Sequence, residues 1–503
     1  MKELLLGIDI GTSACKAAVF DRRGTVLAEA SRPYPVHHPR PGWAEQNPDD
    51  WWRAAAQAIS ELWARGAKPE DVAGVGIDGQ SWSAIAVDGA GNVLCNTPIW
   101  YDTRSQKQCE ELKARIGEEP IFRLCGNPVQ PSYTLPKILW YKENLPDVYR
   151  RTVRILQSNS FIVHRLTGQW SQDLSQGYGL FCFDIAHGEW DWDMAREMGI
   201  DPAMLTEPVR CHDIAGTVTA EAAGLTGLLE GTPVVAGGLD AACSALGAGA
   251  VLPGQTQEQG GTSGGMYICQ AEVVSHPALI LSFHATSDAW LLQGGTVGGG
   301  GVLRWMEQEL CAEERAVGAA RGGSSYDVIN EECANVPAGC DGLVFLPYMA
   351  GERSPIWDPD AKGVFFGLDY TKTRAHMLRA GMEGVAFALK HNLDAAAAAG
   401  VLVRELKAVG GSANSALWTQ IKSDVTGLPI TVPSSGTAAT LGAAMLAGVG
   451  VGVFAGFREA VRDTVRLIRT HEPDMEKHGL YQRQYEIYLE IYRQLKHTMA
   501  KRG

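Results

Sequence analysis

The amino-terminal part of the chain alternates short apolar runs with glycine-bearing turns, a pattern that predicts β-strands joined in hairpins. Residues 4–20 (LLLGIDIGTSACKAAVF) contain an apolar strand, a glycine-bounded turn and a second apolar run. Residues 25–34 follow another turn and are typical of a further strand. Apolar positions at helical spacing begin after Pro48, with Asn47 placed as N-cap. Strand, turn and strand return over residues 72–94, so strands alternate with helices as in an α/β domain.

The opening pattern returns in the second half of the chain, after the segment GAVLPG. Gln255–Met266 has a polar strand start, a turn of glycine, threonine and serine, and an apolar continuation. A glycine-hydroxyl hairpin near the start of each half indicates a duplicated fold whose halves face one another across a cleft, where we expect the chemistry. We therefore predict two domains, divided between residues 253 and 254.

Two helices are predicted near the carboxyl terminus. Thr437–Gly456 is uncharged and long enough to suggest a membrane span, but its many glycine and alanine residues favour a buried helix that a neighbouring backbone can approach closely. Aromatic side chains recur at helical spacing over residues 480–495. An aromatic stripe can stack nucleobases, yet without interleaved basic residues it is better explained as the buried side of an amphipathic helix. The stripe consists of Tyr481, Tyr485, Tyr488, Tyr492 and Leu495.

Composition and charge narrow the classes of function. The chain has 503 residues, of which 45% are hydrophobic, so it can bury a large core. Its formal net charge of −13 comes without a basic block, which argues against a nucleic-acid partner. The 11 cysteines include no CxxC pairs, as expected for reduced thiols, and Asp9 interrupts the apolar run before a signal peptide could form. We expect a cytoplasmic protein with neither a nucleic-acid nor a membrane partner.

Asp9 is the first candidate for chemistry. Gly7 and Gly11 on either side let the backbone turn tightly and approach a ligand. Hydrogen-bond donors follow in Thr12, Ser13 and Lys16. A carboxylate there would repel a phosphate unless a divalent cation lay between them, because Mg2+ combines one or two carboxylates with phosphate oxygens. The spacing excludes a P-loop and a dinucleotide loop, so the segment indicates a metal–nucleotide site, with a plain hairpin turn as the alternative.

Asp240 is the second candidate. An apolar strand delivers this carboxylate into a run of small residues typical of a helix start. A carboxylate in such a position can simply cap the helix. Its place just before the domain boundary also puts it at the expected cleft, where it can accept the proton of a substrate hydroxyl.

A set of motifs running in order from about residue 5 to residue 456 resembles the FGGY carbohydrate kinases, in particular their xylulokinase-like branch. Each motif alone is weak, but together they cover nearly the whole chain. They are GIDIGTS, GWAEQNPDDWW, GIDGQSW, TPIWYDTR, PSYTLPKILW, AGGLDAACSALGAG, GGTSG, PYMAGERSPIWDPDAKGVFFGL, AVGGSANSALWTQIKSDVTGLP and TLGAAMLAG.

The resemblance implies two actin-like, ribonuclease-H-like α/β domains with ATP and a sugar between them. Residues 1–253 would form an N-terminal sugar-binding domain and residues 254–503 a C-terminal nucleotide-binding domain. Asp240 matches the catalytic aspartate, which orients and deprotonates the attacking hydroxyl. Asp9 would hold Mg2+, directly or through water. The implied ATP contacts are Thr12, Ser13, Lys16, Gly261, Thr262, Gly300, Arg304, Gly410, Gly411, Asn414 and Ser415.

The sugar site implied by the resemblance departs from the family pattern. It comprises Gln80, Ser81, Trp82, Asp102, Arg104, Tyr133 and Asp240. Ser81 and Trp82 occupy positions where xylulokinases carry a methionine-histidine pair and glycerol kinases an arginine-glutamate pair. Ala241 replaces an amide of many relatives. We predict a ketopentose such as xylulose as the substrate, with ribulose, glycerol or a tetritol, and a gluconate-like acid left open. An acid would need a fixed cation, for which Arg104 is the candidate.

Two other classes of function are weighed against a small-molecule sugar kinase. One is an actin-superfamily ATPase or scaffold, and the other is a catalytically silent sugar-binding regulator. Asp240 and the GQSW segment oppose a scaffold, which needs no base for a sugar hydroxyl. A regulator would carry a basic DNA-binding helix pair, and no basic segment suggests one. Homodimers are common among similar proteins, and the sequence leaves the oligomeric state open.

Overall fold

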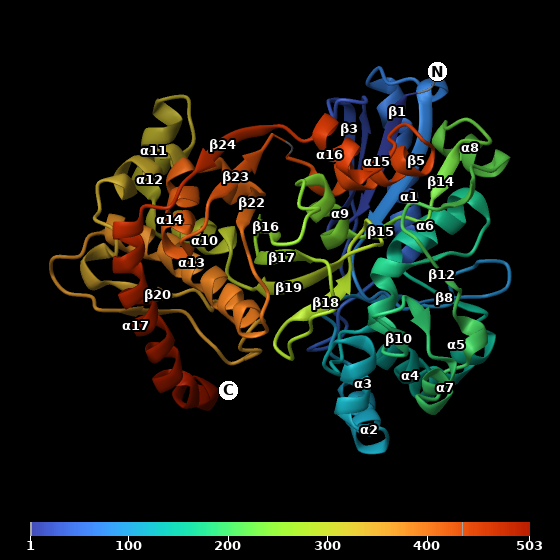
Figure 1. Cartoon of the computed structure of the whole chain (residues 1–503), viewed down its shortest axis with the longest axis horizontal. Helices are drawn as coiled ribbons and strands as arrows, with labels where there is room; N and C mark the ends of the chain where they lie inside the picture. Colours follow the sequence, from blue (N-terminus) through green and yellow to red (C-terminus); the bar gives the residue numbers. More distant parts are fainter. Residues whose placement is uncertain (1–2, 435, 503) are drawn as a thin grey trace. The chain divides into compact units, whose positions relative to one another are not determined.

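The computed structural model describes residues 3–434 and 436–502, which form two compact units (Figure 1). The first unit comprises the chain up to Pro253, together with Cys269–Leu292 and Thr437–Arg466. The second comprises Gly254–Ile268, Gln293–Gly436 and the chain from Leu467 onward. The division of roles predicted for residues 1–253 and 254–503 stays a prediction.

A mixed sheet forms the centre of the first unit, with strands in the order β13-β14-β5-β1-β2-β3, and β15 pairs with β5. These strands are β1 (Leu4–Ile10), β2 (Ala14–Phe20), β3 (Val26–Pro33), β5 (Val72–Gly79), β13 (Ile214–Thr217), β14 (Pro233–Val235) and β15 (Gly238–Leu239). β1 runs antiparallel to β2, which confirms the predicted hairpin, and parallel to β5. The carboxyl ends of β1 and β5 therefore lie at the same edge of the sheet.

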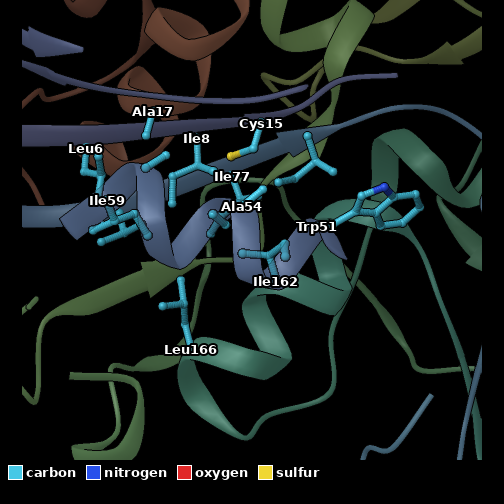
Figure 2. Close-up of a cluster of buried hydrophobic side chains, with 14 of the residues drawn as sticks. Leu6, Ile8, Cys15, Ala17, Trp51, Ala54, Ile59, Ile77, Ile162 and Leu166 are labelled. Carbon is cyan, nitrogen blue, oxygen red and sulfur yellow. The ribbon is translucent and has the colours of Figure 1, made fainter. Parts of the chain in front are cut away.

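One face of this sheet is covered by α1 (Pro48–Ala64) and α6 (Ser158–Thr167) (Figure 2). The helix predicted after Pro48 is confirmed, and the side chain of Asn47 accepts a hydrogen bond from the Asp49 N–H as its cap. Strand residues at alternate positions point into this core, as expected for a sheet with a buried face. The core includes Leu6, Ile8, Trp51, Ile59, Ile77, Ile162 and Leu166.

The other face of the sheet is covered by α9 (Asp240–Gly247) and α15 (Ala438–Gly450). A Cβ atom built on Gly7 would lie 1.9 Å from Thr440 O, and one on Gly76 would lie 1.9 Å from Ala443 O. Only glycine lets the helix backbone rest this closely on the strands. The buried, small-residue helix predicted from residue 437 is thus confirmed. Among the described residues, no helix has the length and apolar character needed to cross a membrane.

The remaining elements of the first unit are shorter. Its helices are α2 (Gln106–Arg115), α3 (Glu118–Cys125), α4 (Thr134–Asn144), α5 (Pro146–Arg151), α7 (Trp192–Glu197), α8 (Ala220–Thr226) and α16 (Phe457–Thr464). Its short strands are β4 (Glu45–Gln46), β6 (Ile85–Val87), β7 (Thr97–Pro98), β8 (Arg154–Leu156), β9 (Gln172–Asp173), β10 (Phe183–Asp184), β11 (Glu189–Trp190), β12 (Pro208–Val209) and β18 (Ile280–Phe283).

The second unit repeats the order of an antiparallel hairpin followed by parallel strands. Its sheet runs β19-β17-β16-β22-β23-β24, with β16 antiparallel to β17 and parallel to β22. The strands are β16 (Gln255–Gly260), β17 (Gly264–Gln270), β19 (Trp290–Thr296), β22 (Glu405–Val409), β23 (Ile430–Pro433) and β24 (Leu467–His471). Since β1, β2 and β5 pair in the same way, the predicted duplication is visible in the pairing of the strands.

Helices surround this second sheet and bury the aromatic stripe. They are α10 (Gly300–Leu310), α11 (Ala312–Ala320), α12 (Ser325–Ala334), α13 (Arg374–Ala398), α14 (Ala416–Thr426) and α17 (Met475–Met499), and a hairpin pairs β20 (Val344–Leu346) with β21 (Val364–Phe366). Tyr481, Tyr485, Tyr488 and Tyr492 of α17 are buried in the core of the unit. The structural interpretation of the stripe is confirmed.

Candidate active site

Three carboxylates lie along one edge of the first sheet. Asp9 of β1 is opposite Asp78 of β5 in the parallel register, and Gly238 of β15 is also opposite Asp78. Asp240 follows β15 as the first residue of α9. Asp78 is fully buried, Asp9 is 8% exposed and Asp240 is partly buried. The strand order brings together the two acidic residues selected from the sequence and adds Asp78, which was not selected.

Burial dominates the charge state of these groups. It raises the pKa of Asp9 above its usual value, while Lys16, whose Nζ lies 3.9 Å from Asp9 Oδ2, lowers it. Burial, followed by the negative charge of Asp9, raises the pKa of Asp240 to about 7. The N–H of Ala241 donates to Asp240 Oδ1 at 2.6 Å and opposes this rise. Burial and the charges of Asp9 and Asp240 hold the pKa of Asp78 well above its usual value.

The predicted phosphate donors lie in the turn and strand after Asp9. The Thr12 hydroxyl oxygen accepts a hydrogen bond from Trp100 Nε1 at 2.9 Å and keeps its own proton for another acceptor. The side chain of Lys16 is 58% exposed, and Ser13 is exposed as well. Within residues 3–434 and 436–502, there is no group of at least three His, Cys, Asp or Glu side chains that could hold a metal ion.

An aromatic cluster is formed by the predicted sugar residues Trp82 and Tyr133. Their rings stack with centroids 4.2 Å apart, and Tyr178 meets the Trp82 ring edge-on at 5.9 Å. Trp82 has a φ of 59°, in the left-handed region that side chains rarely adopt. Lys137 Nζ donates to Trp82 O at 2.8 Å and to Ile99 O at 2.9 Å, so it fixes this strained turn. Burial lowers the pKa of Lys137 to about 7.

The neighbouring residues of the predicted sugar site do not present an unpaired charge to a substrate. Gln80 Nε2 donates to Gln46 Oε1 at 2.9 Å, and Ser81 is half-buried. Arg104 donates to Asp102 Oδ2 and to Glu45 Oε2, both at 2.8 Å. These two carboxylates balance the Arg104 charge. Burial lowers the pKa of the guanidinium, but the hydrogen bonds and charges of the two carboxylates together outweigh this and raise it. The Arg104 guanidinium also lies over the rings of Trp43 and Trp140, at 3.9 and 5.1 Å from their centroids.

A cavity of about 640 Å3 lies within the second unit. Its walls are formed by the turn between β16 and β17, the start of α10 and the loop after β22. All the predicted ATP contacts of this unit except Gly410 line the cavity. Gly410 lies directly behind it, since a Cβ there would be 2.8 Å from the Gly260 backbone. The lining residues are Gly260, Gly261, Thr262, Gly300, Leu303, Arg304, Ser324, Tyr326, Asp327, Asn330, Gly411, Ser412, Asn414, Ser415 and Trp418.

Close backbone contacts shape this cavity. The N–H of Gly300 donates to Gly261 O at 2.7 Å, so α10 begins directly against the glycine turn. Ser415 caps α14 and donates its hydroxyl proton to Asn330 Oδ1 at 2.7 Å. Asn330 and Tyr326 were missed in the sequence, because the segment around α12 carries no motif of its own.

Comparisons with known proteins agree with one another. The model of the FGGY family of carbohydrate kinases, N-terminal domain, matches residues 4–247, and that of the C-terminal domain matches residues 259–451. The chain is 31% identical to the xylulose kinase of Bacillus subtilis, over 97% of this chain and 96% of that protein. It is 29% identical to the gluconokinase of Bacillus licheniformis, over 100% and 98% of the two chains. The crystal structure of xylulose kinase from Rhodospirillum rubrum matches with a TM-score of 0.89 and 31% identity, over 99% and 100%.

Proposed function

Because the chain belongs to the FGGY family of carbohydrate kinases, we propose that it transfers the terminal phosphoryl group of ATP to a hydroxyl of a ketopentose such as xylulose. Membership of the family makes the chain an ATP-dependent sugar kinase with the two-domain, actin-like α/β fold of its relatives. The identity of the sugar and the roles of the individual residues are our inference.

Asp240 carries the proposal. It is a partly buried carboxylate at the start of α9, and its pKa of about 7 suits a base that must take and release a proton at neutral pH. The acceptor oxygen forms a bond to the terminal phosphorus, and the bond from that phosphorus to the departing ADP oxygen breaks. Asp240 takes the proton of the hydroxyl as these bonds change.

The cavity of the second unit is the proposed site for the nucleoside part of ATP. Its volume of about 640 Å3 is in the range of ligand-binding cavities. We assign Gly410, Gly411, Asn414 and Ser415 to the adenosine, and Gly261, Thr262, Gly300 and Arg304 to the phosphates. In the first unit, Thr12, Ser13 and Lys16 are the proposed phosphate donors.

The residues around Asp9 fit a Mg2+ ion that accompanies ATP. Asp9 and Asp78 offer hard carboxylate oxygens, and the two buried residues are opposite one another at the ends of neighbouring parallel strands. Mg2+ takes few protein ligands and keeps phosphate oxygens and water, so one or two carboxylates are sufficient at such a site. Asp9 would hold the ion, which neutralises phosphate charge when bound.

The charges near the aromatic cluster favour a neutral sugar over a sugar acid. Arg104, the candidate partner for a substrate carboxylate, is already balanced by Asp102 and Glu45. A carboxylate brought beside it would meet two negative charges. Trp82 and Tyr133 are uncharged and buried, with 7% and 1% of their surface exposed, so they bring no cation to balance a substrate carboxylate. We therefore place a ketopentose before gluconate.

A coupled assay of ADP release tests the function. The enzyme is supplied with Mg-ATP and with D-xylulose, L-xylulose, ribulose, glycerol, erythritol or gluconate, and Asp240→Asn is measured beside it. We expect one ketopentose to stimulate ADP release far above the sugar-free rate, and Asp240→Asn to bind ATP and lose nearly all transfer.

Other outcomes separate the alternatives. Stimulation by gluconate alone would replace the substrate class and leave the kinase assignment intact. Near-normal turnover by Asp240→Asn would remove its role as base. ATP hydrolysis that no sugar stimulates would favour the scaffold or regulator class.

A further inference from the structure

A fully buried polar network lies behind the strand ends of the first unit. Asp173, at the end of β9, is its hub. Asp173 Oδ1 accepts hydrogen bonds from the hydroxyl of Ser175 at 2.5 Å and from the N–H of Gln176 at 3.1 Å. Asp173 Oδ2 accepts one from Asn159 Nδ2 at 2.9 Å. These three donors are uncharged. The Asp173 carboxylate therefore orients the hydrogen bonds of its neighbours without a positively charged partner among them.

Ser175 connects this network to Leu239, the residue before the proposed base. Its single hydroxyl proton is given to Asp173, which leaves the oxygen lone pairs to accept the N–H of Leu239 at 2.8 Å. Leu239 is followed directly by Asp240, and it has no side-chain cap of its own for α9. Gly238 permits the approach, since a Cβ there would be 3.0 Å from Ser175 Oγ.

The other members of the network hold the adjoining strands. Asn159 Nδ2 also donates to Ala236 O at 3.2 Å, on the segment that leads to β15. Gln176 Nε2 donates to Gly79 O at 3.2 Å, at the end of β5. The same hub therefore fixes the strand end that carries Asp78 and the one that carries Asp240.

We propose that Ser175, oriented by Asp173, is a positioning residue for the base Asp240. The inference rests on the proposed function of Asp240 and concerns the orientation of its carboxylate. Without the Ser175 oxygen, the Leu239 N–H is a buried donor without a partner, and the peptide must move to find one. A displacement of about 1 Å at a reacting group lowers a rate by roughly 100-fold.

A pair of serine substitutions tests this inference on the full-length enzyme. Ser175→Ala removes the acceptor of Leu239. Ser171→Ala is the matched control, because Ser171 is also buried in the same segment and its hydroxyl has no hydrogen-bond partner among the described residues. The readouts are kcat, the KM for the sugar that stimulates ADP release, and the affinity for ADP by calorimetry.

We expect Ser175→Ala to lower kcat by about 10- to 100-fold while the ADP affinity stays within about twofold of the parent. Ser171→Ala should match the parent in all three readouts. Ser175→Cys keeps the volume but replaces the oxygen with a weak acceptor, so it should lower kcat in the same direction even if Ser175→Ala proves hard to produce.

Two results would overturn the inference: a kcat of the Ser175 variants equal to that of Ser171→Ala, or a parallel loss of kcat and ADP affinity, which indicates general damage. The failure of the proposed function has a different signature. In that case Asp240→Asn itself keeps its turnover, whatever the Ser175 variants do.

Discussion

Gly7 of β1 lies directly under the carbonyl group of Thr440, so that a Cβ atom at Gly7 would stand 1.9 Å from the Thr440 oxygen. We expect Gly7→Ala to lower the free energy of unfolding by about 3 kcal/mol, because α15 must lift from the sheet. Urea unfolding measures the change. Gly224→Ala is the control, since it lies inside α8 with no atom within 4 Å of its new Cβ, and the helix should be unchanged or more stable.

The pH dependence of transfer should report the state of Asp240. Its pKa of about 7 means that the fraction able to accept a proton grows as pH rises through 7. We expect kcat/KM for the sugar to rise about tenfold per pH unit well below 7 and to level off above it. A profile that is flat from pH 5.5 to 8 would show that Asp240 does not limit the step.

Removal of the Asp240 charge should stabilise the fold at neutral pH. The folded-state pKa is raised above the unfolded value, so the folded protein holds a proton more tightly and this group reduces stability as pH rises from about 4 to about 7. Asp240→Asn should therefore have a higher Tm than the parent at pH 7.5, and the difference should shrink at pH 5. A lower Tm at pH 7.5 would contradict the burial cost assigned to this carboxylate.

Lys137 is expected to support both stability and sugar affinity. Its Nζ is the donor to two buried carbonyl groups, Trp82 O and Ile99 O. Lys137→Met should lower the free energy of unfolding by about 2 to 4 kcal/mol and raise the KM for the sugar, because the Trp82 turn loses its support. Tyr141→Phe, on the same helix, removes a hydroxyl that donates to one backbone carbonyl group, Ala84 O, and should cost less. Equal KM values for the two variants would remove the special role of Lys137.

Gly300 is expected to control the nucleotide cavity. A Cβ at Gly300 would lie 2.8 Å from Gly261 O, so Gly300→Ala should push α10 away from the glycine turn. We expect an affinity for ADP about tenfold lower, equivalent to about 1.4 kcal/mol, measured by calorimetry. Gly479→Ala, in α17 of the same unit with open space around its Cβ, is the control and should bind ADP normally.

Local patterns were sufficient for the elements whose signals are contiguous. Asn47 and Pro48 predict the start of α1. The small residues after Thr437 predict a buried helix, and the tyrosine spacing predicts the apolar side of α17. Each of these depends on caps and periodicity within one segment, which physical rules read directly.

The site needed more than local pattern. Asp78 joins Asp9 only because β5 pairs in parallel with β1, and Asn330 reaches Ser415 across 85 positions of sequence. Arg104 looked available for an acid, yet Glu45, which neutralises it, lies 59 positions away. Such pairings are set by sheet order and tertiary packing, which a single sequence does not encode as a spacing.

The late position of α15 in the chain has a consequence for synthesis. The helix covers the face of a sheet whose first strand is β1, although more than four hundred residues separate them. While the ribosome is still adding the intervening segments, the glycine-bearing part of that face, on β1 and β5, lacks the cover that α15 provides. A nascent chain released before α15 should therefore leave an apolar surface open to association, so the sheet of the first unit is protected only after α15 has been synthesised.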